Sequence, residues 1–553
     1  MKRQLLAIPV VLALALTACA SGNQGATNGA SGAPDGTGTD LSNLLVTTPA
    51  ATGDLDLVSW NLPLGEPASL DPIKAFNYPE NTVVSNLCEG LMQLQPDYSI
   101  EPGLAEKVDS PDAATYVYTI RQGVTFWDGQ AMTADDVLFS LNRHLNADEG
   151  SYWAGGIVSN IASIEKTGDW EITVTLKSPD STFNSYMVTP LGTVVEKAQR
   201  EAAGENYGNP TGKVMCTGPF SVGDWNQGQK LSLMRNDNYW NADKMAKTAQ
   251  IDINFIVDSA AIANALSTGE LDGSYDLPLS ALSTLENSSN GSLYLGQSLQ
   301  MLAIIGTGNG AFADPAVRQA LMMATDREAI AATVFEGTAT ASRSLVPNNG
   351  WAYGNDVFAA GRDTLAPTAV DIDGAKEALK SATTDLSQPI KIVYPSERTY
   401  YADIISEIAN GGKAIGLTVE PEGVPSAQFG AFFSDPKARE GHDAFVTNNY
   451  MDVPDPLAFL RTIVGTGGSQ NYNGYSEAAV DDLIAQAAAT GDDNERADLV
   501  NQLQERVMTD LPWIPIVDPS VRLFMSNRVT GAPASFVYLY YPWAADVGAS
   551  GNQ

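Results

Sequence analysis

The chain has 553 residues, of which 44% are hydrophobic and 17% are charged, so it is long enough for two or three folded domains. Its 65 acidic and 31 basic side chains give a net charge of −34, which repels nucleic acid and anionic lipid. We therefore predict no nucleic-acid partner, and the acidity otherwise serves to keep a protein surface soluble.

The first residues have the pattern of an export signal. Lys2 and Arg3 precede an apolar run from Leu5 to Leu16, which is too short to span a bilayer as a helix but has the length of a signal-peptide core. No later apolar run is long enough to span a membrane. We therefore expect a signal peptide over residues 1–18.

The end of this signal, Leu16-Thr17-Ala18-Cys19, resembles the lipobox of bacterial lipoproteins. The resemblance implies that Cys19 becomes a lipidated membrane anchor; the alternative is an ordinary secretory signal with an incidental cysteine. Residues 20–40 are almost all small or polar and cannot bury enough apolar surface to fold. We expect residues 19–53 to be a lipidated cysteine and a flexible linker.

Strand-like alternation and helix-like periods mix through the body, which predicts an α/β or α+β architecture. Residues 116–121 and 170–177 alternate as half-buried strands do. Between them, Thr133 begins a helix and Asp136 follows three residues later, close to a capping box. This part of the chain is expected to form one subdomain.

Two further helix starts are marked by their capping residues. Asp314 and Pro315 have the pattern of an N-cap followed by a first-turn proline. Thr325 and Glu328 predict a capping box for the next helix, which Gly337 closes.

From residue 389 the pattern is strand, helix, strand, short helix and strand, ending with HDAFVTNNY at 442–450. Such a run predicts a parallel sheet with right-handed crossovers, and ligands of such sheets bind beyond the carboxyl ends of the strands. The next residues, MDVPDP at 451–456, lie at one of those ends and place Asp452 and Asp455 among two prolines.

Several stretches of the body occur in a recognisable order. They are EPASLDP (66–72), NLCEGL (86–91), LAEKVDSPDAATYVYTIRQGVTFWDGQAMTADDVLFSLNR (104–143), CTGPF (216–220), NDNYW (236–240), DPAVRQALMMATDREAI (314–330), DVPDP (452–456) and RVMTDLPWIPIV (506–517). Together they resemble the family 5 extracellular solute-binding proteins of ABC importers, a group that includes oligopeptide, dipeptide and nickel binders. The resemblance runs over nearly all of the chain after the linker.

The resemblance implies an α/β, two-lobed fold of the class II periplasmic-binding-protein type, with an extra subdomain inserted in lobe I. It places the first part of lobe I at residues 54–98, the inserted subdomain at 99–213, the second part of lobe I at 214–298, lobe II at 299–518 and a return to lobe I at 519–553.

Asp452 falls where peptide binders of this family keep an aspartate that pairs with the α-amino group of the peptide. Pro454 and Pro456 restrict the backbone around it, so that little entropy would be lost when a ligand binds. The alternative is that this loop recurs whatever the ligand is, with Asp455 only capping the helix that follows.

Two aromatic stretches complete the ligand-binding residues that the resemblance implies. Phe76, Asn77 and Tyr78 fall where oligopeptide binders contact an extended peptide from lobe I, and Asn449 and Tyr450 would contribute from lobe II. Tyr78 and Tyr450 could equally be ordinary half-buried aromatics. The chain departs from the oligopeptide binders at Val446, which is aligned with an arginine, and at Asn449, which is aligned with a tryptophan; Arg439 aligns poorly as a substitute arginine.

Cys88 and Cys216 are a joint departure, because the family usually has an aromatic residue and a glycine at these positions. Apart from Cys19 they are the only cysteines of the chain. We predict a Cys88–Cys216 disulfide, and the alternative is two free buried thiols.

Signals of enzymatic chemistry are weak. Ser163 and Lys166 match S-x-x-K, and Lys166 also opens K-T-G, but these motifs must lie on separate elements and here they share one lysine in an expected turn. His144 and His442 form no metal motif and are expected at the surface or at caps, and Gly306-x-Gly308-x-Gly310 lacks the dinucleotide-binding spacing. We predict no catalytic residue, no metal site and no cofactor.

We predict an extracytoplasmic lipoprotein that captures oligopeptides or dipeptides and delivers them to an ABC importer. Its expected partners are the peptide, the transmembrane permease subunits and, through the lipid on Cys19, the outer face of the cell membrane; it is expected to be a monomer. Two alternatives remain open. One is an oligosaccharide binder, and the other is a binder of a metal that arrives already chelated, which scarce histidine does not exclude.

Overall fold

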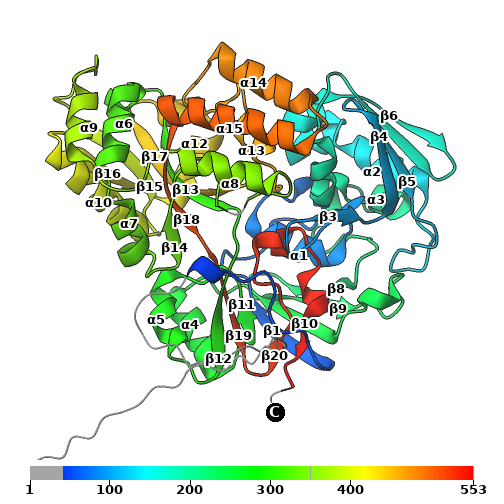
Figure 1. The fold of residues 1–553 in the computed structure, drawn as a ribbon. Coiled ribbons are helices and arrows are strands. Elements are labelled where there is room, and N and C mark those ends of the chain that lie inside the picture. The colour runs from blue at the N-terminus through cyan, green and yellow to red at the C-terminus, as the bar shows by residue number, and fades with distance from the viewer. Residues whose placement is uncertain (1–40, 349, 552–553) are drawn as a thin grey trace, which may run out of the picture. The chain divides into compact units, whose positions relative to one another are not determined.

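Two large sheets organise the chain in the computed structural model (Figure 1). The structure describes residues 41–348 and 350–551, so the predicted signal peptide, Cys19 and the first part of the predicted linker lie outside the described residues. All described residues belong to one unit of the chain, Asp40–Gln553. We call the part built on the seven-stranded sheet lobe I and the part built on the six-stranded sheet lobe II.

The sheet of lobe I has the strand order β12-β19-β11-β1-β10-β9-β8. Its central strand β1 pairs in parallel with β10 and β11, and the other neighbours are antiparallel. The strands are β1 (Leu55–Asn61), β8 (Phe220–Asn226), β9 (Lys230–Arg235), β10 (Thr248–Asn254), β11 (Gly273–Ser274), β12 (Gly291–Gly296) and β19 (Val521–Ser526). Figure 1 shows β19, in red near the end of the chain, beside the green strands β11 and β12 from the middle of the chain.

Lobe I has an aromatic core in addition to its helices, which are α1 (Tyr78–Leu87), α4 (Ser259–Thr268) and α5 (Leu282–Glu286). Trp60 on β1 packs against Trp543 and Tyr275, with ring centroids 4.7 and 5.5 Å apart, and all three side chains are buried. The last turns of the chain therefore complete the core that the first strand begins.

The sheet of lobe II confirms the predicted β-α-β-α-β run. Its order is β14-β18-β13-β17-β15-β16, and β15 pairs in parallel with both β16 and β17. β13 and β18 extend the sheet by antiparallel pairing. The strands are β13 (Gln300–Gly306), β14 (Ala339–Ala341), β15 (Ile390–Pro395), β16 (Val419–Val424), β17 (Ala444–Tyr450) and β18 (Trp513–Pro519).

One of the two capping residues predicted for lobe II, Asp314, marks a helix start. Asp314 accepts a hydrogen bond from the N–H of Ala316 (3.0 Å) and caps α6, as predicted. The helices are α6 (Pro315–Ala324), α7 (Arg327–Ala329), α8 (Asn355–Thr364), α9 (Ile372–Leu379), α10 (Tyr400–Ala414), α11 (Ser426–Phe429), α12 (Ala431–Ser434), α13 (Pro456–Val464), α14 (Ala478–Ala489) and α15 (Asp493–Asp510).

The predicted capping box at Thr325 is wrong. Asp326 caps α7 by accepting from the N–H of Ala329 (2.8 Å), whereas the Thr325 hydroxyl donates to the carbonyl of Leu321 (2.7 Å) at the end of α6. The carboxylate of Asp326 competes with the neighbouring Thr325 hydroxyl for the same N–H groups, and the carboxylate is the group that caps the helix. Gly337 does close this segment: its φ is +74° and its N–H donates to the carbonyl of Ala331 (3.1 Å).

A third sheet is formed by residues that lie in the sequence between strands β1 and β8 of lobe I. Its order is β4-β5-β7-β6, with β4 (Ala105–Asp112), β5 (Thr115–Ile120), β6 (Ile161–Gly168) and β7 (Glu171–Leu176), and the short helices α2 (Ala134–Arg143) and α3 (Lys197–Ala203) lie in the same part of the chain. The predicted cap of α2 is confirmed, since Asp136 accepts from the N–H and hydroxyl of Thr133 (2.9 and 2.7 Å). Short pairs, β2 (Met92–Leu94) with β3 (Ile100–Pro102) and β20 (Val529–Thr530) with β21 (Gly548–Ala549), complete the strands.

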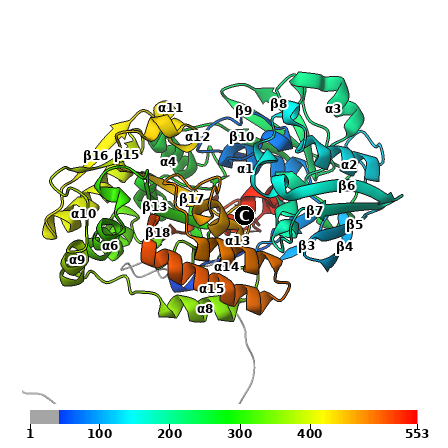
Figure 2. The ribbon, with the colours of Figure 1, turned by 90° about the horizontal axis from the view of Figure 1, so that it is seen from above.

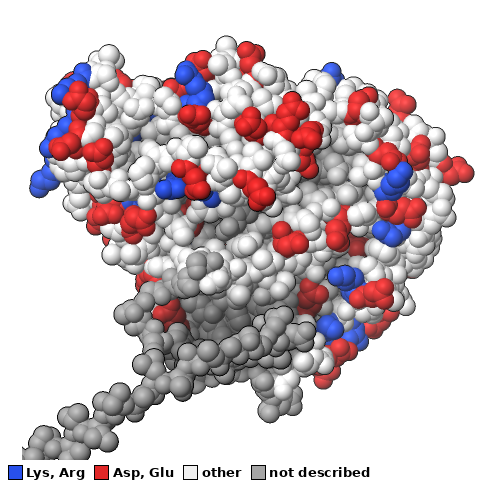
Figure 3. All heavy atoms as spheres, in the orientation of Figure 1, with Lys and Arg blue, Asp and Glu red and all other residues white. Residues whose placement is uncertain are grey.

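Helices α13 to α15 connect lobe II with the four-stranded sheet, as the view from above shows (Figure 2). The N–H of Ser181, beyond β7, donates to the carbonyl of Ala488 in α14 (2.8 Å). The described surface carries more acidic than basic groups on the face drawn in Figure 3, where the acidic ones are spread over many elements.

Candidate functional site

The segment of five residues from Met451 to Asp455 joins β17 to α13 and carries the two aspartates that the sequence singles out. Because β17 and β15 are parallel, the segment lies beyond the carboxyl ends of neighbouring strands. Asp455 is 1% exposed and Asp452 is half-buried. The two carboxylates nevertheless have very different surroundings.

Asp455 is the N-cap of α13. Its carboxylate accepts hydrogen bonds from the N–H groups of Leu457 (2.9 Å) and Ala458 (3.4 Å) and from the hydroxyl of Tyr353 (3.2 Å). Arg496 lies 3.9 Å from the second carboxylate oxygen. The capping role that was the alternative for Asp455 is therefore confirmed, and Pro456 occupies the first turn of the helix.

Asp452 has one hydrogen bond, which the hydroxyl of Tyr540 donates (2.8 Å). Burial raises the pKa of Asp452 to about 6, and the bond from Tyr540 opposes that rise. No lysine, arginine or histidine forms an ion pair with this carboxylate among the residues that the structure describes. Tyr540 belongs to the C-terminal segment of lobe I, so the bond joins the two lobes.

Aromatic side chains from both lobes surround Asp452, and with it they form what we call the interlobe site. The hydroxyl of Tyr450 donates to the carbonyl of Phe76 (2.9 Å), and the rings of Tyr450 and Tyr78 lie 5.1 Å apart, edge to face. Phe76 and Tyr152 stack with centroids 4.4 Å apart, although their side chains are 45% and 55% exposed. The interlobe site consists of Phe76, Tyr78, Tyr152, Tyr450, Asp452 and Tyr540.

The two predicted asparagines support this arrangement through local hydrogen bonds. Asn77 caps α1 by accepting from the N–H of Tyr78 (2.9 Å). Asn449 accepts from the N–H of Tyr450 (2.9 Å) and donates to Gln470 (2.7 Å). The structure therefore brings all six predicted ligand-binding residues into one region, with the asparagine side chains already engaged.

Arg398 is a residue that the sequence reasoning missed. It follows the end of β15 by three residues, as Asp452 follows the end of β17 by two, so a cation and a carboxylate stand at the ends of adjacent parallel strands. The side chain of Arg398 is exposed, and its charge lowers the pKa of Tyr78 and Asp276, which burial raises. The rule that ligands bind beyond such ends could have found it.

A second missed contact joins lobe II to the four-stranded sheet. Arg461 on α13 forms an ion pair with Asp180, which is buried, and donates to the hydroxyl of Thr182 (3.1 Å). Asp180 also accepts from the N–H of Thr182 (3.1 Å), which fixes the loop that presents it. The two partners are 281 residues apart, and no local pattern indicates such a pair.

Cys88 and Cys216 form a disulfide, with Cα atoms 4.9 Å apart and a sequence separation of 128. The bond ties the C-cap of α1 to the segment that leads into β8. Arg439, weighed as a substitute arginine, donates to the carbonyl of Phe432 (2.5 Å) and lies over the ring of Tyr472 (5.4 Å).

The weak enzymatic motifs have structural roles. Ser163 and Lys166 lie on strand β6, not in the expected turn, and Lys166 pairs with Asp135 (3.0 Å). His442 contacts Glu422 (3.2 Å). His144 is the C-cap of α2 but is 1% exposed, and burial lowers its pKa to about 3. Within the described ranges, no group of three or more His, Cys, Asp or Glu side chains could hold a metal ion, and no helix is long and apolar enough to cross a membrane.

Comparison with known proteins identifies the family of this chain. The model of the bacterial extracellular solute-binding proteins, family 5, matches residues 99–471, and the chain belongs to this family. It is 25% identical over 502 residues to the dipeptide-binding protein DppE of Bacillus subtilis (strain 168), covering 87% of this chain and 90% of the relative.

Two further proteins are similar over most of the chain. The glutathione-binding protein GsiB of Salmonella typhi is 26% identical over 481 residues, covering 84% of this chain and 89% of that one. The periplasmic binding protein DppA from Helicobacter pylori, solved in complex with the peptide STSA, superposes with a TM-score of 0.75 at 24% identity, covering 90% of this chain and 98% of that one. The fold is thus the two-lobed α/β fold of class II periplasmic binding proteins.

Proposed function

We propose that this solute-binding protein captures peptides between its lobes and delivers them to the permease of an ABC importer. The observation that carries the proposal is Asp452, a carboxylate in the interlobe site with one hydrogen bond and no cation among the described residues. Removing a carboxylate from water without a cation is costly. The ammonium group of a ligand supplies the missing charge and a charge-assisted hydrogen bond.

Arg398 supports a ligand that carries a negative charge as well. It stands at the end of the strand next to the one that presents Asp452, and no ion pair engages it within residues 41–348 and 350–551. A peptide has an ammonium group at one end and a carboxylate at the other, so the two side chains match its termini. The peptide-related names of the three relatives described above agree with this class.

Closure of the lobes on the ligand is the proposed mechanism. Contacts between the lobes include the hydrogen bonds of Tyr540 to Asp452 and of Tyr450 to Phe76, the ion pair of Arg461 with Asp180 and the ring contact of Tyr450 with Tyr78. A ligand that bridges the lobes adds contacts only to the closed form and shifts the equilibrium toward it. The permease would recognise that form, and no catalytic step or cofactor is needed.

The remaining predictions are retained as proposals. The division into lobe I (54–98, 214–298 and 519–553), an inserted subdomain (99–213) and lobe II (299–518) is supported by the separate membership of strands in three sheets. A signal peptide, a lipid on Cys19 that anchors the protein to the outer face of the cell membrane, and a monomeric state rest on the sequence pattern.

Calorimetry with peptides tests the function. The purified chain, refolded to remove bound ligand, is titrated with matched di- to nonapeptides that have free or acetylated N-termini. We expect binding of the free-amine peptides, and loss of it on acetylation. Small-angle scattering should show compaction with the same peptides. Absence of binding by every free-amine peptide would refute the peptide assignment, and turnover of any peptide would refute the non-enzymatic role.

A further inference from the structure

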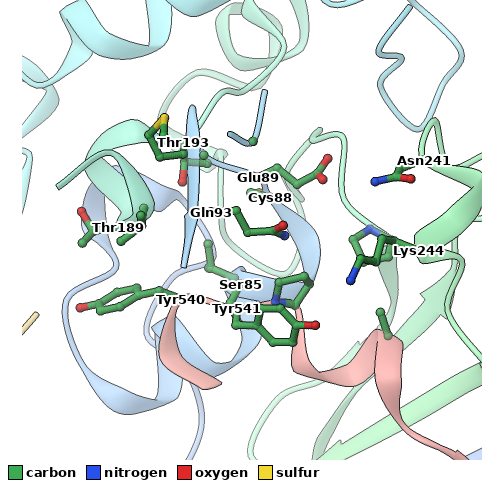
Figure 4. A pocket seen from close by; sticks show the side chains of 18 of the residues that line it. Ser85, Cys88, Glu89, Gln93, Thr189, Thr193, Asn241, Lys244, Tyr540 and Tyr541 are labelled. Carbon is green, nitrogen blue, oxygen red and sulfur yellow. The ribbon is translucent and has the colours of Figure 1, made fainter. Parts of the chain in front are cut away.

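Tyr540, whose hydroxyl donates to Asp452, also lines a polar pocket that does not include Asp452 (Figure 4). The pocket has a volume of about 190 Å³ and is formed by α1, the β2–β3 pair, the turn at residues 189–193, the segment around Lys244 and the C-terminal turns at 539–546. Figure 4 shows Gln93, Asn241 and Lys244 turned toward one another across it, with Tyr541 beneath. The volume corresponds to roughly six water molecules at about 30 Å³ each.

The two carboxylates of the pocket already have hydrogen-bond donors. Glu89 accepts from Thr217 (2.7 Å), Tyr239 (2.6 Å) and Trp240 (2.8 Å). Asp546 accepts from the hydroxyl of Tyr541 (2.6 Å). All of these donors are neutral, so the negative groups are satisfied without using the cations nearby.

Neither of the two cations of the pocket forms an ion pair with a described residue. Arg121 uses Nε on the carbonyl of Gly103 (3.0 Å) and lies over the ring of Trp240 (5.4 Å), but neither of its terminal nitrogens has a hydrogen bond to a described residue. Lys244 lines the pocket and forms no ion pair within the described chain. Their charges reach Glu89 and Asp546 respectively at longer range, lowering pKa values that burial raises.

Asn81 provides an unpaired acceptor in the wall. Its side chain is fully buried, and its Nδ2 donates to the hydroxyl of Tyr540 (3.4 Å), which itself donates to Asp452. That chain of donors fixes the orientation of the amide. The Oδ1 atom of Asn81 then has no hydrogen-bond partner among the described residues, although buried acceptors are nearly always paired.

We propose that this pocket is a second small-molecule site, separate from the interlobe site, which binds a small carboxylic acid that also carries an O–H or N–H donor. The carboxylate of the ligand engages Lys244 and Arg121, and its donor engages Asn81. The terminal nitrogens of Arg121, the exposed ammonium group of Lys244 and one buried acceptor without a donor define both halves of the ligand. Tyr540 contributes to both sites, but Asp452 does not line this pocket, so each site binds its own ligand.

The test uses pairs of acids that differ in one hydroxyl: lactate with propionate, and malate with succinate. Each acid is titrated into the full chain by calorimetry at constant ionic strength. Crystals of the protein are then soaked in the acid that binds most tightly, so that its position can be determined. We expect saturable binding of lactate or malate, and weaker binding of the partner acid without the hydroxyl. None of the four acids has an amino group, so the result is independent of the proposed peptide function.

Lys244→Gln should weaken binding of the hydroxy acid about tenfold, the loss expected for one charge-assisted hydrogen bond. Lys247→Gln, three residues along the same segment and outside the pocket lining, is the matched control and should bind as the unmodified chain does. Lack of saturable binding by all four acids, equal binding within each pair, or equal effects of the two substitutions would overturn the proposal.

Discussion

Asp452 and Asp455 lie three residues apart in one loop, and burial raises the pKa of both carboxyls. The two carboxylates differ in the number of groups that contact them. Asp455 has two backbone donors, a tyrosine hydroxyl and a nearby guanidinium. Asp452 has only the hydroxyl of Tyr540. The carboxylate with three hydrogen-bond donors and a nearby guanidinium holds a helix in place, and the one with a single donor and no cation beside it is available to a ligand.

The largest expected effect is that of Asp452→Asn on peptide affinity. The change keeps the shape of the side chain but removes the charge, which should weaken binding of a free-amine peptide by about 2–5 kcal/mol, or at least roughly thirtyfold. Calorimetry measures the loss, and the acetylated peptide is the control. An affinity equal to that of the unmodified chain would place the amine elsewhere.

Asp455→Ala is expected to lower the stability of the protein, in contrast to Asp452→Asn, which lowers its peptide affinity. The substitution removes the cap of α13 and the partner of the Tyr353 hydroxyl, whereas Arg496 keeps its ion pair with Asp493, so the free energy of unfolding should fall by about 1–3 kcal/mol. Urea denaturation followed by circular dichroism measures this change. Asp452→Asn is the matched comparison, and it should leave the free energy of unfolding unchanged or raised, because it removes a buried charge. Equal destabilisation by the two substitutions would contradict the structural role of Asp455 and the ligand-binding role of Asp452.

Peptide affinity and the free energy of unfolding should both depend on pH through Asp452. Ligand-free Asp452 has a pKa of about 6, so peptide affinity should fall about tenfold per pH unit below pH 6 as the carboxylate takes up a proton. The folded pKa lies above the ordinary value of 3.8, so the folded state binds more protons than the unfolded state between about pH 4 and 6. The contribution of Asp452 to stability therefore declines as pH rises through that window.

The measurement is calorimetry from pH 5 to 8, together with urea denaturation of the unmodified chain and of Asp452→Asn at the same pH values. The difference in stability between the two chains isolates the contribution of Asp452 from other buried carboxyls such as Asp518, whose pKa burial also raises to about 6. A flat affinity between pH 5 and 7 would contradict the assignment of the ligand charge to this group.

The smallest expected effect is that of Tyr540→Phe. Loss of one hydrogen bond to the carboxylate should weaken peptide binding at pH 7.5 by about 1 kcal/mol, or roughly fivefold. Because that bond lowers the pKa of Asp452, the midpoint of the pH dependence should move to higher pH. A midpoint that moved to lower pH would show that Tyr540 does not stabilise the ionised form.

Features that depend on neighbouring residues were predictable from the sequence. The alternation of strands and helices from residue 389 to 450 defines the parallel part of the lobe II sheet, and the cap residues Asp314 and Thr133 mark true helix starts. The position of Asp452 at a strand end follows from the same pattern. These features require only periodicity and short-range hydrogen bonds.

Features that depend on distant residues were not predictable in the same way. Tyr540 is 88 residues from Asp452 in the sequence, and Asp180 is 281 from Arg461, so only the folded chain shows that each pair meets. The pairing of β13 with β17 and β18 is similarly non-local. Arg398 is the exception, since its place at a parallel strand end was visible from the pattern that located Asp452.

The position of β19 constrains the order in which the protein can be built. A strand from residues 521–526 lies between β11 and β12, which are made some 230–250 residues earlier. During synthesis β11 lacks its neighbour on one side and β12 lacks its only strand partner in the sheet, so their unpaired edges are open to other chains. Lobe I therefore becomes complete only when the last part of the polypeptide arrives, and a chain that ends before β19 should aggregate even though lobe II is nearly whole.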